Sequence, residues 1–200
     1  MTIDKDNLLN SILESISRID YVKSADIPNI DLYMDQVTTF MEKALSSSKR
    51  YPEDKILTKT MINNYAKNDL LPPPIKKKYS KEHLMLLTFV YYFKNILSIS
   101  DIETLLRPIT EKYFHSDEEL SISYIYDQVC AFEKERTHNL QEDIKDAYET
   151  SKKTFTEIDE DNRELLQFFS FICMLSLDVY VKKQIIEKCI DIMNDVDKKK

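Results

Sequence analysis

The sequence predicts an all-α protein, and three observations support that prediction. The chain of 200 residues contains no glycine, so the tight turns that usually join antiparallel strands lack their preferred residue. Apolar residues recur at helical spacing through most of the chain. Hydrophobic residues make up 42% of the sequence and charged residues 32%, a balance typical of a folded, water-soluble protein.

The N-terminal half begins with three predicted helices. The first covers residues 6–19, where leucines and isoleucines share one face. Asp31 is expected to cap the second helix, which ends near Leu45. A long polar loop broken by Pro52 leads to a short third helix that begins near Thr58 or Thr60.

The third predicted helix is followed by an unusual exit. Its inward residues are Met61, Ile62 and Tyr65. Asn68 and Asp69 are expected to end it, because both residue types tolerate the left-handed backbone that glycine would normally supply. The three prolines at 72–74 cannot continue a helix, so they hold the chain extended into the lysines that follow. A short pair of strands is the only β-structure expected, and it would lie there.

A strongly apolar helix is predicted next, with Ser80 as its cap. The run from His83 to Leu97 is apolar on nearly every side, so this helix should lie at the centre of the core. A further helix starts with a capping box of Ser100 and Glu103. Pro108 is expected to stop that helix.

The C-terminal half is predicted to contain three amphipathic helices in an acidic region, at about residues 117–137, 139–157 and 162–195. Its most apolar run, Leu165 to Val181, is interrupted by polar residues and falls short of the roughly 20 apolar residues of a membrane span. We therefore expect a buried helix. The predicted division is a domain at 1–110 and a helical subdomain at 111–200, for dimerisation or sensing.

Charge is distributed unevenly along the chain. The formal net charge is −7, which by itself argues against a nucleic-acid partner. Between Lys49 and Lys81, however, basic residues outnumber acidic ones nine to three. A basic segment within an acidic protein is compatible with DNA binding by that segment alone.

The order of elements in residues 31–107 resembles the MerR-type winged helix-turn-helix. The shared features are a short helix with an aromatic at Tyr65, the exit "LLPPP" from Leu70, the basic stretch "KKKYS" ending at Ser80, and the later "LSISDIETLL". The strings "IPNIDLYMDQVTTFME" and "KTMINNYAKNDLLPPPIKKKYS" are also similar to an uncharacterised bacterial domain-of-unknown-function family, DUF1836, built on this arrangement.

This resemblance implies a winged helix-turn-helix that binds double-stranded DNA, although the sequence departs from the MerR pattern. The loop at residues 46–57 is longer than a usual helix-turn-helix turn. The wing carries lysines, which neutralise phosphates but lack the two-pronged base recognition of arginine. The predicted DNA-binding residues are Lys59, Thr60, Asn63, Asn64, Lys67, Lys76, Lys77, Lys78 and Tyr79.

Each predicted contact has its own chemistry. Thr60, Asn63 and Asn64 are short hydrogen-bonding residues, and asparagine can pair with an adenine edge. The lysines of the helix and wing suit phosphate contacts. Tyr79 is expected either to pack its ring beneath the wing or to donate its hydroxyl to a phosphate.

Catalysis is not expected. The histidines at 83, 115 and 138 are scattered, and the three cysteines lack metal-ligand spacing. Without glycine, glycine-rich phosphate-binding loops and nucleotide-binding turns are excluded. The sequence therefore predicts no catalytic residue, no metal and no cofactor, and the absence of a signal-peptide pattern indicates a cytoplasmic protein.

The predicted function is sequence-specific transcriptional regulation by DNA binding. The alternative is a helical protein-interaction adaptor that does not bind DNA, which the acidic remainder of the chain and the missing arginines favour. A homodimer and an apolar small-molecule effector are left open as partners, and a membrane is not expected.

Overall fold

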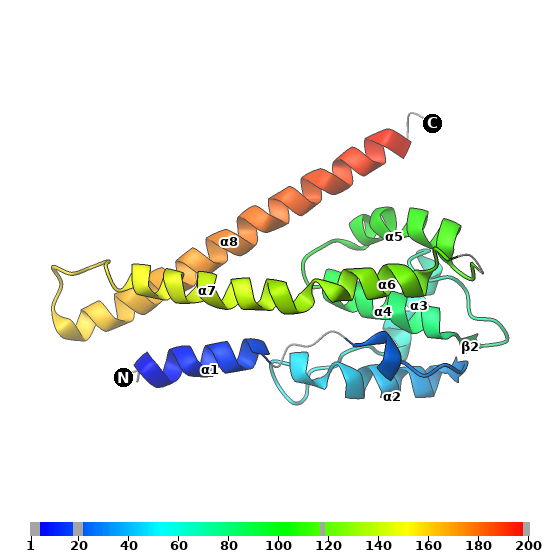
Figure 1. Cartoon of the computed structure of the whole chain (residues 1–200), viewed down its shortest axis with the longest axis horizontal. Helices are drawn as coiled ribbons and strands as arrows, with labels where there is room; N and C mark the ends of the chain where they lie inside the picture. Colours follow the sequence, from blue (N-terminus) through cyan, green and yellow to red (C-terminus); the bar gives the residue numbers. More distant parts are fainter. Residues whose placement is uncertain (1–4, 18–21, 117–118, 198–200) are drawn as a thin grey trace. The chain divides into compact units, whose positions relative to one another are not determined.

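The computed structural model describes residues 5–17, 22–116 and 119–197. Within them the all-α prediction is confirmed: the chain is mostly helical, with two strands of two residues each. The elements in chain order are α1 (Lys5–Ser17), β1 (Leu32–Tyr33), α2 (Met34–Ala44), α3 (Lys59–Lys67), β2 (Lys78–Tyr79), α4 (Lys81–Phe93), α5 (Ile99–Tyr113), α6 (Ile122–Ala131), α7 (Glu133–Ser151) and α8 (Glu160–Asp197). Figure 1 labels them.

The chain forms two compact units. Unit 1 consists of Met1–Asp20 and Phe132–Ile186, and unit 2 consists of Tyr21–Ala131 and Glu187–Lys200. The two segments of unit 1 therefore lie before and after the long continuous segment of unit 2 in the sequence. The division predicted at residue 110 stays a prediction.

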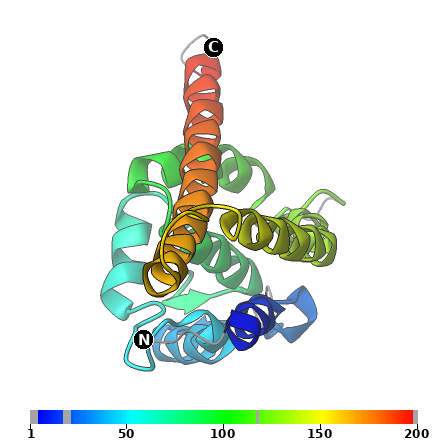
Figure 2. The same ribbon diagram turned by 90° about the vertical axis from the view of Figure 1, so that its left-hand side faces the viewer.

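In unit 2 a short ladder sets the start of α2. Leu32 and Tyr33 pair antiparallel with Tyr79 and Lys78, and β2 lies between α2 and α4 (Figure 2). Because the ladder holds Leu32 and Tyr33 extended, α2 begins only at Met34 with Tyr33 at its N-cap. The cap predicted at Asp31 is therefore wrong. The strand partner of β2 is β1, next to α2, and within the wing itself an isolated antiparallel bridge joins Ile75 to Lys78.

Helix α3 matches its sequence signals at both ends. The Thr58 side chain accepts a hydrogen bond from the backbone N–H of Met61, at 3.2 Å. At the other end Asp69 has a φ of 55°, and the N–H of Leu70 reaches the carbonyl of Tyr65 at 3.0 Å. This is the Schellman arrangement, in which a left-handed residue closes the helix. Ile62 and Tyr65 face the core, as predicted.

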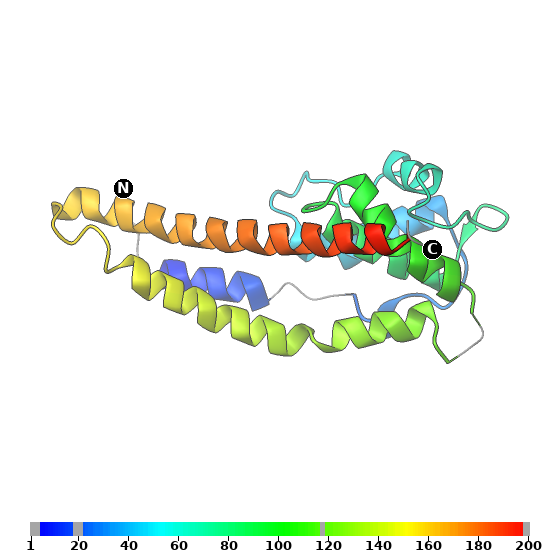
Figure 3. The ribbon, with the colours of Figure 1, turned by 90° about the horizontal axis from the view of Figure 1, so that it is seen from above.

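The segment of residues 72–79, which we name the lysine hairpin, returns from α3 to α4. The N–H of Lys78 donates to the carbonyl of Ile75 at 2.9 Å. The two residues between them, Lys76 and Lys77, have φ values of 51° and 65°. Two positive φ values in a two-residue turn are what type I′ hairpins require. The hairpin projects from unit 2 next to α3 (Figures 1 and 3).

Helix α4 is the centre of unit 2, as predicted. Nine of its thirteen residues are buried. Helix α5 starts differently from the prediction: Ser98 is the N-cap, and its Oγ accepts from the N–H of Asp101 at 3.2 Å. Pro108 lies inside α5 and does not stop it, because a proline removes one backbone hydrogen bond and the rest of the helix continues past it.

The predicted helix over 117–137 is shorter than expected. Helix α6 covers Ile122–Ala131, and α7 starts at Glu133 after a break at Phe132. In unit 1, α1 runs alongside α7 (Figures 1 and 3). The core of this unit is a buried cluster of Ile144, Tyr148 and Phe171, against which apolar residues of α1 pack.

Helix α8 differs most from its prediction. The run Leu165–Val181 was expected to be buried, yet only Gln167 and Phe171 are buried there. Among the described residues, Asn162–Val196 is the one stretch long and apolar enough, by length and composition alone, to cross a membrane. The same test is passed by core helices of soluble proteins, so it is weak evidence.

Candidate nucleic-acid interface

The polar residues predicted to read DNA lie on the outer side of α3. Thr60, Asn63 and Asn64 are exposed, and so are the lysines at either end of the helix, Lys59 and Lys67. The opposite side carries the buried Ile62 and Tyr65. The helix therefore presents short hydrogen-bonding side chains flanked by positive charge, which is the composition that a base-reading helix uses.

The start of α2 contacts both α3 and the lysine hairpin. The Lys59 ammonium forms an ion pair with the Asp35 carboxylate. The Lys78 ammonium lies over the Tyr33 ring, 5.3 Å from its centroid. Tyr33 and Asp35 are two residues apart, which is at most roughly 7 Å of chain. The first turn of α3 and the base of the hairpin thus meet the same terminus of α2.

Two of the three lysines of the hairpin are exposed. Lys76 and Lys77 at the tip are exposed, and Lys78 is half-buried. A left-handed backbone costs roughly 1–2 kcal/mol for a residue other than glycine. The tip therefore holds its positive charges in an unfavourable conformation, where Asn-Gly would fit without strain.

Tyr79 does not belong to this surface. Its side chain is 2% exposed, and its ring lies edge-on to the ring of His83 at 5.4 Å between centroids. Burial also raises the pKa of its hydroxyl. Of the two roles predicted for Tyr79, packing beneath the wing is the one found, and the predicted DNA contact is wrong because its side chain is not accessible to a phosphate.

His83 connects the two ends of the lysine hairpin. Its Nδ1 accepts a hydrogen bond from the backbone N–H of Ser80 at 3.0 Å, and its Nε2 lies 3.2 Å from the carbonyl oxygen of Pro72. Because a carbonyl can only accept, Nε2 carries a proton. Because Nδ1 accepts a hydrogen bond, it carries none, and the ring is therefore neutral. Burial lowers the pKa of His83 to about 4, which keeps this arrangement intact at neutral pH.

The long loop between α2 and α3 is held by two lysines. Lys49 forms an ion pair with Glu42 and donates to the carbonyl of Pro52 at 3.3 Å. Its hydrogen bond lowers the pKa of Glu42. Lys94 donates to the carbonyl of Ile56 at 2.9 Å. Lys49 belongs to the basic segment of the sequence, yet its role is to fix this loop.

A groove of about 600 Å³ runs between α2 and the start of α3. Lys43, Lys55 and Lys59 line it, together with threonines and Glu42. Three lysines against one carboxylate give this groove an excess of positive charge. It extends the basic surface from α3 along α2.

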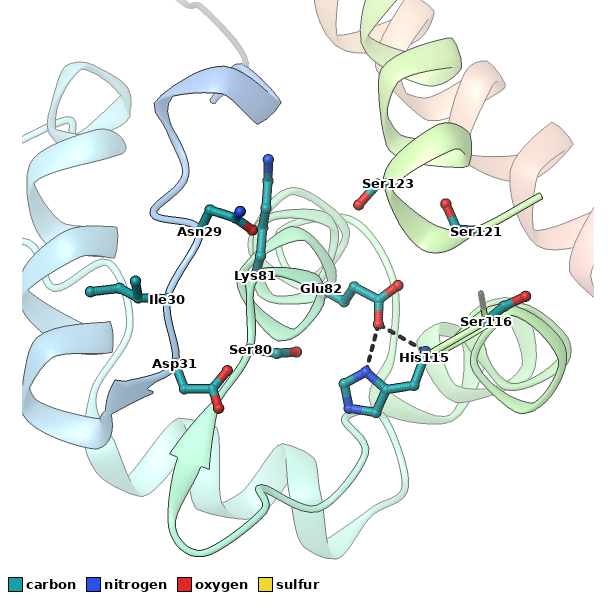
Figure 4. A pocket seen from close by; sticks show the side chains of 10 residues that line it. All are labelled: Asn29, Ile30, Asp31, Ser80, Lys81, Glu82, His115, Ser116, Ser121 and Ser123. Carbon is teal, nitrogen blue, oxygen red and sulfur yellow. Dashed lines mark hydrogen bonds and ion pairs between the residues drawn. The ribbon is translucent and has the colours of Figure 1, made fainter. Parts of the chain in front are cut away.

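A second cavity, of about 370 Å³, lies beside the β1–β2 ladder. Asp31 precedes β1, and Ser80 follows β2. In Figure 4 Asn29 and Lys81 stand on one wall and Ser121 and Ser123 on the other. This volume suits a small molecule, but the polar lining does not offer the surroundings that an apolar effector would need.

The carboxylate of Glu82 faces that cavity and has a fixed position. Its Oε2 accepts hydrogen bonds from the backbone N–H of His115 at 2.8 Å and lies 3.0 Å from the Nδ1 of the same histidine (Figure 4). His115 itself has a φ of 54°. The pair therefore ties the turn after α5 to the first turn of α4.

Local sequence patterns do not predict the roles of three residues in this region. His83 stands three residues after Ser80, the spacing of a capping box, but its second partner Pro72 is eleven residues away. Asp35 and Tyr33 gain their roles only through contacts with Lys59 and Lys78. Local sequence spacing cannot predict the role of a residue whose partner lies in another element.

The site belongs to a helical domain in which a short polar helix and a basic hairpin contact one terminus of a third helix. Residues 22–129, more than half of the chain, match the family described as Domain of unknown function (DUF1836), and the chain belongs to this family. The matched range nearly coincides with the continuous part of unit 2, Tyr21–Ala131. No curated protein and no solved structure matches the chain.

Proposed function

We propose that this protein is a sequence-specific DNA-binding transcriptional regulator that acts by binding, not by catalysis. In this proposal α2, α3 and the lysine hairpin form a MerR-like winged helix-turn-helix, with α3 reading base edges and the hairpin contacting phosphates. The protein would work on DNA in the cytoplasm.

The observation that carries the proposal is the backbone of Lys76 and Lys77. Both are exposed and both have a positive φ. Strained residues persist where the surrounding structure enforces them, and they gather at functional sites. Two adjacent lysines at the tip of a projecting turn are a costly choice for folding alone. A requirement for positive charge at the tip explains them.

The exposed side of α3 supplies the second part of the proposed mechanism. Asn63 or Asn64 would accept from and donate to an adenine edge in the major groove, while Lys59 and Lys67 hold the phosphates on either side. His83 fixes both ends of the hairpin, so that the lysines keep a constant position relative to α4.

The decisive experiment measures binding to duplex DNA from the protein's own upstream region at several salt concentrations. Replacing Lys76, Lys77 and Lys78 by alanine should flatten the dependence of log K on log salt by roughly 2 to 3, since each phosphate contact contributes about 0.9. Asn63→Ala should instead reduce discrimination between sequences and leave the salt slope unchanged.

A matched control removes the same charge elsewhere. Replacing Lys145, Lys152 and Lys153 by alanine changes three lysines of unit 1 and should leave the salt slope as it is. If both triple variants flatten the slope equally, binding is a general effect of charge and the interface is misplaced.

The second candidate function is a protein-interaction adaptor. The net charge of −7 favours it, as does the ion pair that partly neutralises Lys59. Failure to retard any duplex at low salt, with the fold intact, would favour the adaptor over the regulator.

A further inference from the structure

We propose that a row of side chains on the β1–β2 ladder packs against the deoxyribose rings that wall the minor groove of bound DNA. The row, which we name the ladder row, consists of Tyr33, Lys78 and Ile75. The contact rests on the proposed function and adds an apolar component to it. Neither Tyr33 nor Ile75 is among the predicted DNA-binding residues.

The pairing of the strands places these three side chains on one face. Tyr33 pairs directly with Lys78 in the ladder, and Lys78 also forms an antiparallel bridge with Ile75. Residues directly opposite each other on antiparallel strands carry their side chains on the same face. The neighbouring pair, Leu32 and Tyr79, points to the other face and is buried. The ladder row therefore faces away from the core.

Both ends of the ladder row offer exposed apolar surface. Tyr33 is 53% exposed and Ile75 is 61% exposed, and the Lys78 ammonium lies over the Tyr33 ring between them. Folding alone does not require an apolar residue at position 75, because threonine is also β-branched and would place its hydroxyl in water. The isoleucine is thus available to contact a partner.

Charge favours DNA as that partner. The lysine hairpin, residues 72–79, carries three lysines and no carboxylate. Its two exposed lysines follow Ile75 directly. A duplex presents phosphates at regular intervals with sugar rings between them, so the lysines can pair with phosphates while Ile75 contacts a sugar.

Two carboxylates near Tyr33 limit the surface on its other side. Asp35 is paired with Lys59, which partly neutralises its charge. Asp31 is exposed and lines the polar cavity beside the ladder. Because a carboxylate repels phosphates, the DNA backbone must lie toward the lysine tip, and Tyr33 is the last residue of the row that it can reach.

The ladder row suits sugars better than base edges. Base edges are read by hydrogen-bonding side chains, and Ile75 has no such group. Proteins that enter the minor groove use apolar side chains there together with lysine or arginine. The hairpin projects next to α3 (Figures 1 and 3). With α3 in the major groove, the hairpin would reach the adjacent minor groove, as the arms of other DNA-binding domains do.

The three kinds of contact respond differently to salt and to sequence. Lysine–phosphate contacts release counterions, so their loss flattens the salt dependence of binding. Base contacts determine the discrimination between sequences. An apolar contact with sugars does neither. Loss of the ladder row should therefore lower the affinity by the same factor at every salt concentration and on every duplex.

The test uses the full chain and two duplexes of equal length, one from the protein's own upstream region and one of unrelated sequence. Ile75→Thr keeps the β-branched shape, and Tyr33→Ser keeps a residue that can cap α2. Each should lower the affinity roughly five- to tenfold on both duplexes, with an unchanged salt slope. Tyr33→Phe should keep most of the affinity, because it retains the ring.

Hydroxyl-radical cleavage provides a direct readout, because the radical attacks deoxyribose from the minor groove. On the upstream duplex the wild type should protect a group of sugars beside the bases covered by α3. In Ile75→Thr those sugars should become open to cleavage, while the bases covered by α3 stay protected.

Tyr124→Ser and Ile99→Thr are the matched controls. Tyr124 is 45% exposed in α6, and Ile99 is 50% exposed in α5. Both changes remove a similar exposed side chain from unit 2 and should leave the affinity as it is. Circular dichroism should show the same helix content in all variants.

The outcomes separate this contact from the proposed function. If the folded wild type retards neither duplex, both are overturned. If it binds with a salt slope that depends on the hairpin lysines, but Ile75→Thr and Tyr33→Ser bind equally well, the sugar contact alone is overturned. A flatter salt slope in Ile75→Thr would also overturn it, because the isoleucine would then only position the lysines. Equal losses in the control variants would do the same.

Discussion

Helices α4 and α8 both contain long apolar runs, but they lie in different surroundings. Helix α4 is apolar on nearly every side, and nine of its thirteen residues are buried. The central run of α8, Leu165–Val181, is as apolar, but only two of its residues are buried. Apolar content alone therefore does not tell how much of a helix the fold covers.

Length explains the difference between the two helices. Helix α8 has 38 residues, or about 57 Å. Its neighbours in unit 1 are shorter: α7 has 19 residues, about 29 Å, and α1 has 13, about 20 Å. Helix α4 also has 13 residues, so the elements around it can cover it from end to end.

The largest expected effect on stability comes from replacing one leucine by alanine in each helix. Leu86→Ala in α4 should lower the free energy of unfolding by roughly 2–5 kcal/mol, because Leu86 is fully buried. Leu177→Ala in α8 should change it by less than about 0.5 kcal/mol, because Leu177 is 61% exposed. Urea unfolding measures both. Equal losses would mean that α8 is covered within the chain.

The next largest effect contrasts how the two helices begin. Neutral His83 holds the start of α4, and its pKa of about 4 lies below the ordinary 6.5. Its contribution is complete above pH 6.5 and is lost progressively as the pH falls from 6.5 to about 4. Unit 2 should therefore lose roughly 3 kcal/mol over that range. Urea unfolding at several pH values measures this loss.

His83→Gln provides the control for that experiment, since glutamine can donate and accept but does not titrate in this range. The loss between pH 6.5 and 4 should be smaller in the variant by the part that His83 contributes. The start of α8 should behave differently, because Asn162 lowers the pKa of Asp159 from 3.8, so that its cap persists to lower pH. Identical pH profiles for the wild type and the variant would mean that His83 does not cause the loss of stability.

A smaller effect is expected in the turn that leads into α4. The double change Lys76→Asn and Lys77→Gly supplies the residues that this turn prefers. It should raise the free energy of unfolding by roughly 1–3 kcal/mol and weaken DNA binding at the same time. Changes of opposite sign in stability and binding would distinguish a functional turn from a merely tolerated one. A gain in both would contradict the proposed role of the hairpin.

The smallest effect concerns the exposed ion pair of Lys59 and Asp35. Asp35→Asn should alter stability by less than about 1 kcal/mol, because exposed pairs contribute little. It should nevertheless strengthen DNA binding a few-fold at low salt, since Lys59 is released and a negative charge is removed. Fluorescence anisotropy with a labelled duplex would measure this. Weaker binding would indicate that the pair positions α3.

Local signals predicted much of unit 2. Thr58 and Asp69 identified the two ends of α3, and the apolar run after Ser80 identified the central helix. The start of α2 could not be predicted from Asp31, because β1 pairs with a strand some 45 residues later in the chain. Pro108 was also misleading, because it lies inside a helix. The division between α6 and α7 falls at Phe132, not near residue 138 as predicted. Such outcomes depend on tertiary contacts.

The candidate site was likewise predicted only in part from the sequence. The exposed positions of Asn63, Asn64 and the tip lysines follow from the helical period and from the prolines. The burial of Tyr79 and the bridging by His83 do not, because each depends on a partner from another element. Helix α8 was misjudged for a related reason: composition describes what a helix could bury, and the number of neighbours decides what it does bury.

Unit 1 is assembled from two segments that are far apart in the sequence, and this has a consequence for synthesis. Helix α1 is synthesised before its packing partner α7, which emerges from the ribosome more than a hundred residues later. Until then the leucines and isoleucines of α1 that pack against the cluster of Ile144 and Tyr148 have no core to join. The newborn chain therefore carries an unsatisfied apolar segment while unit 2 folds, which makes it a natural client for chaperones.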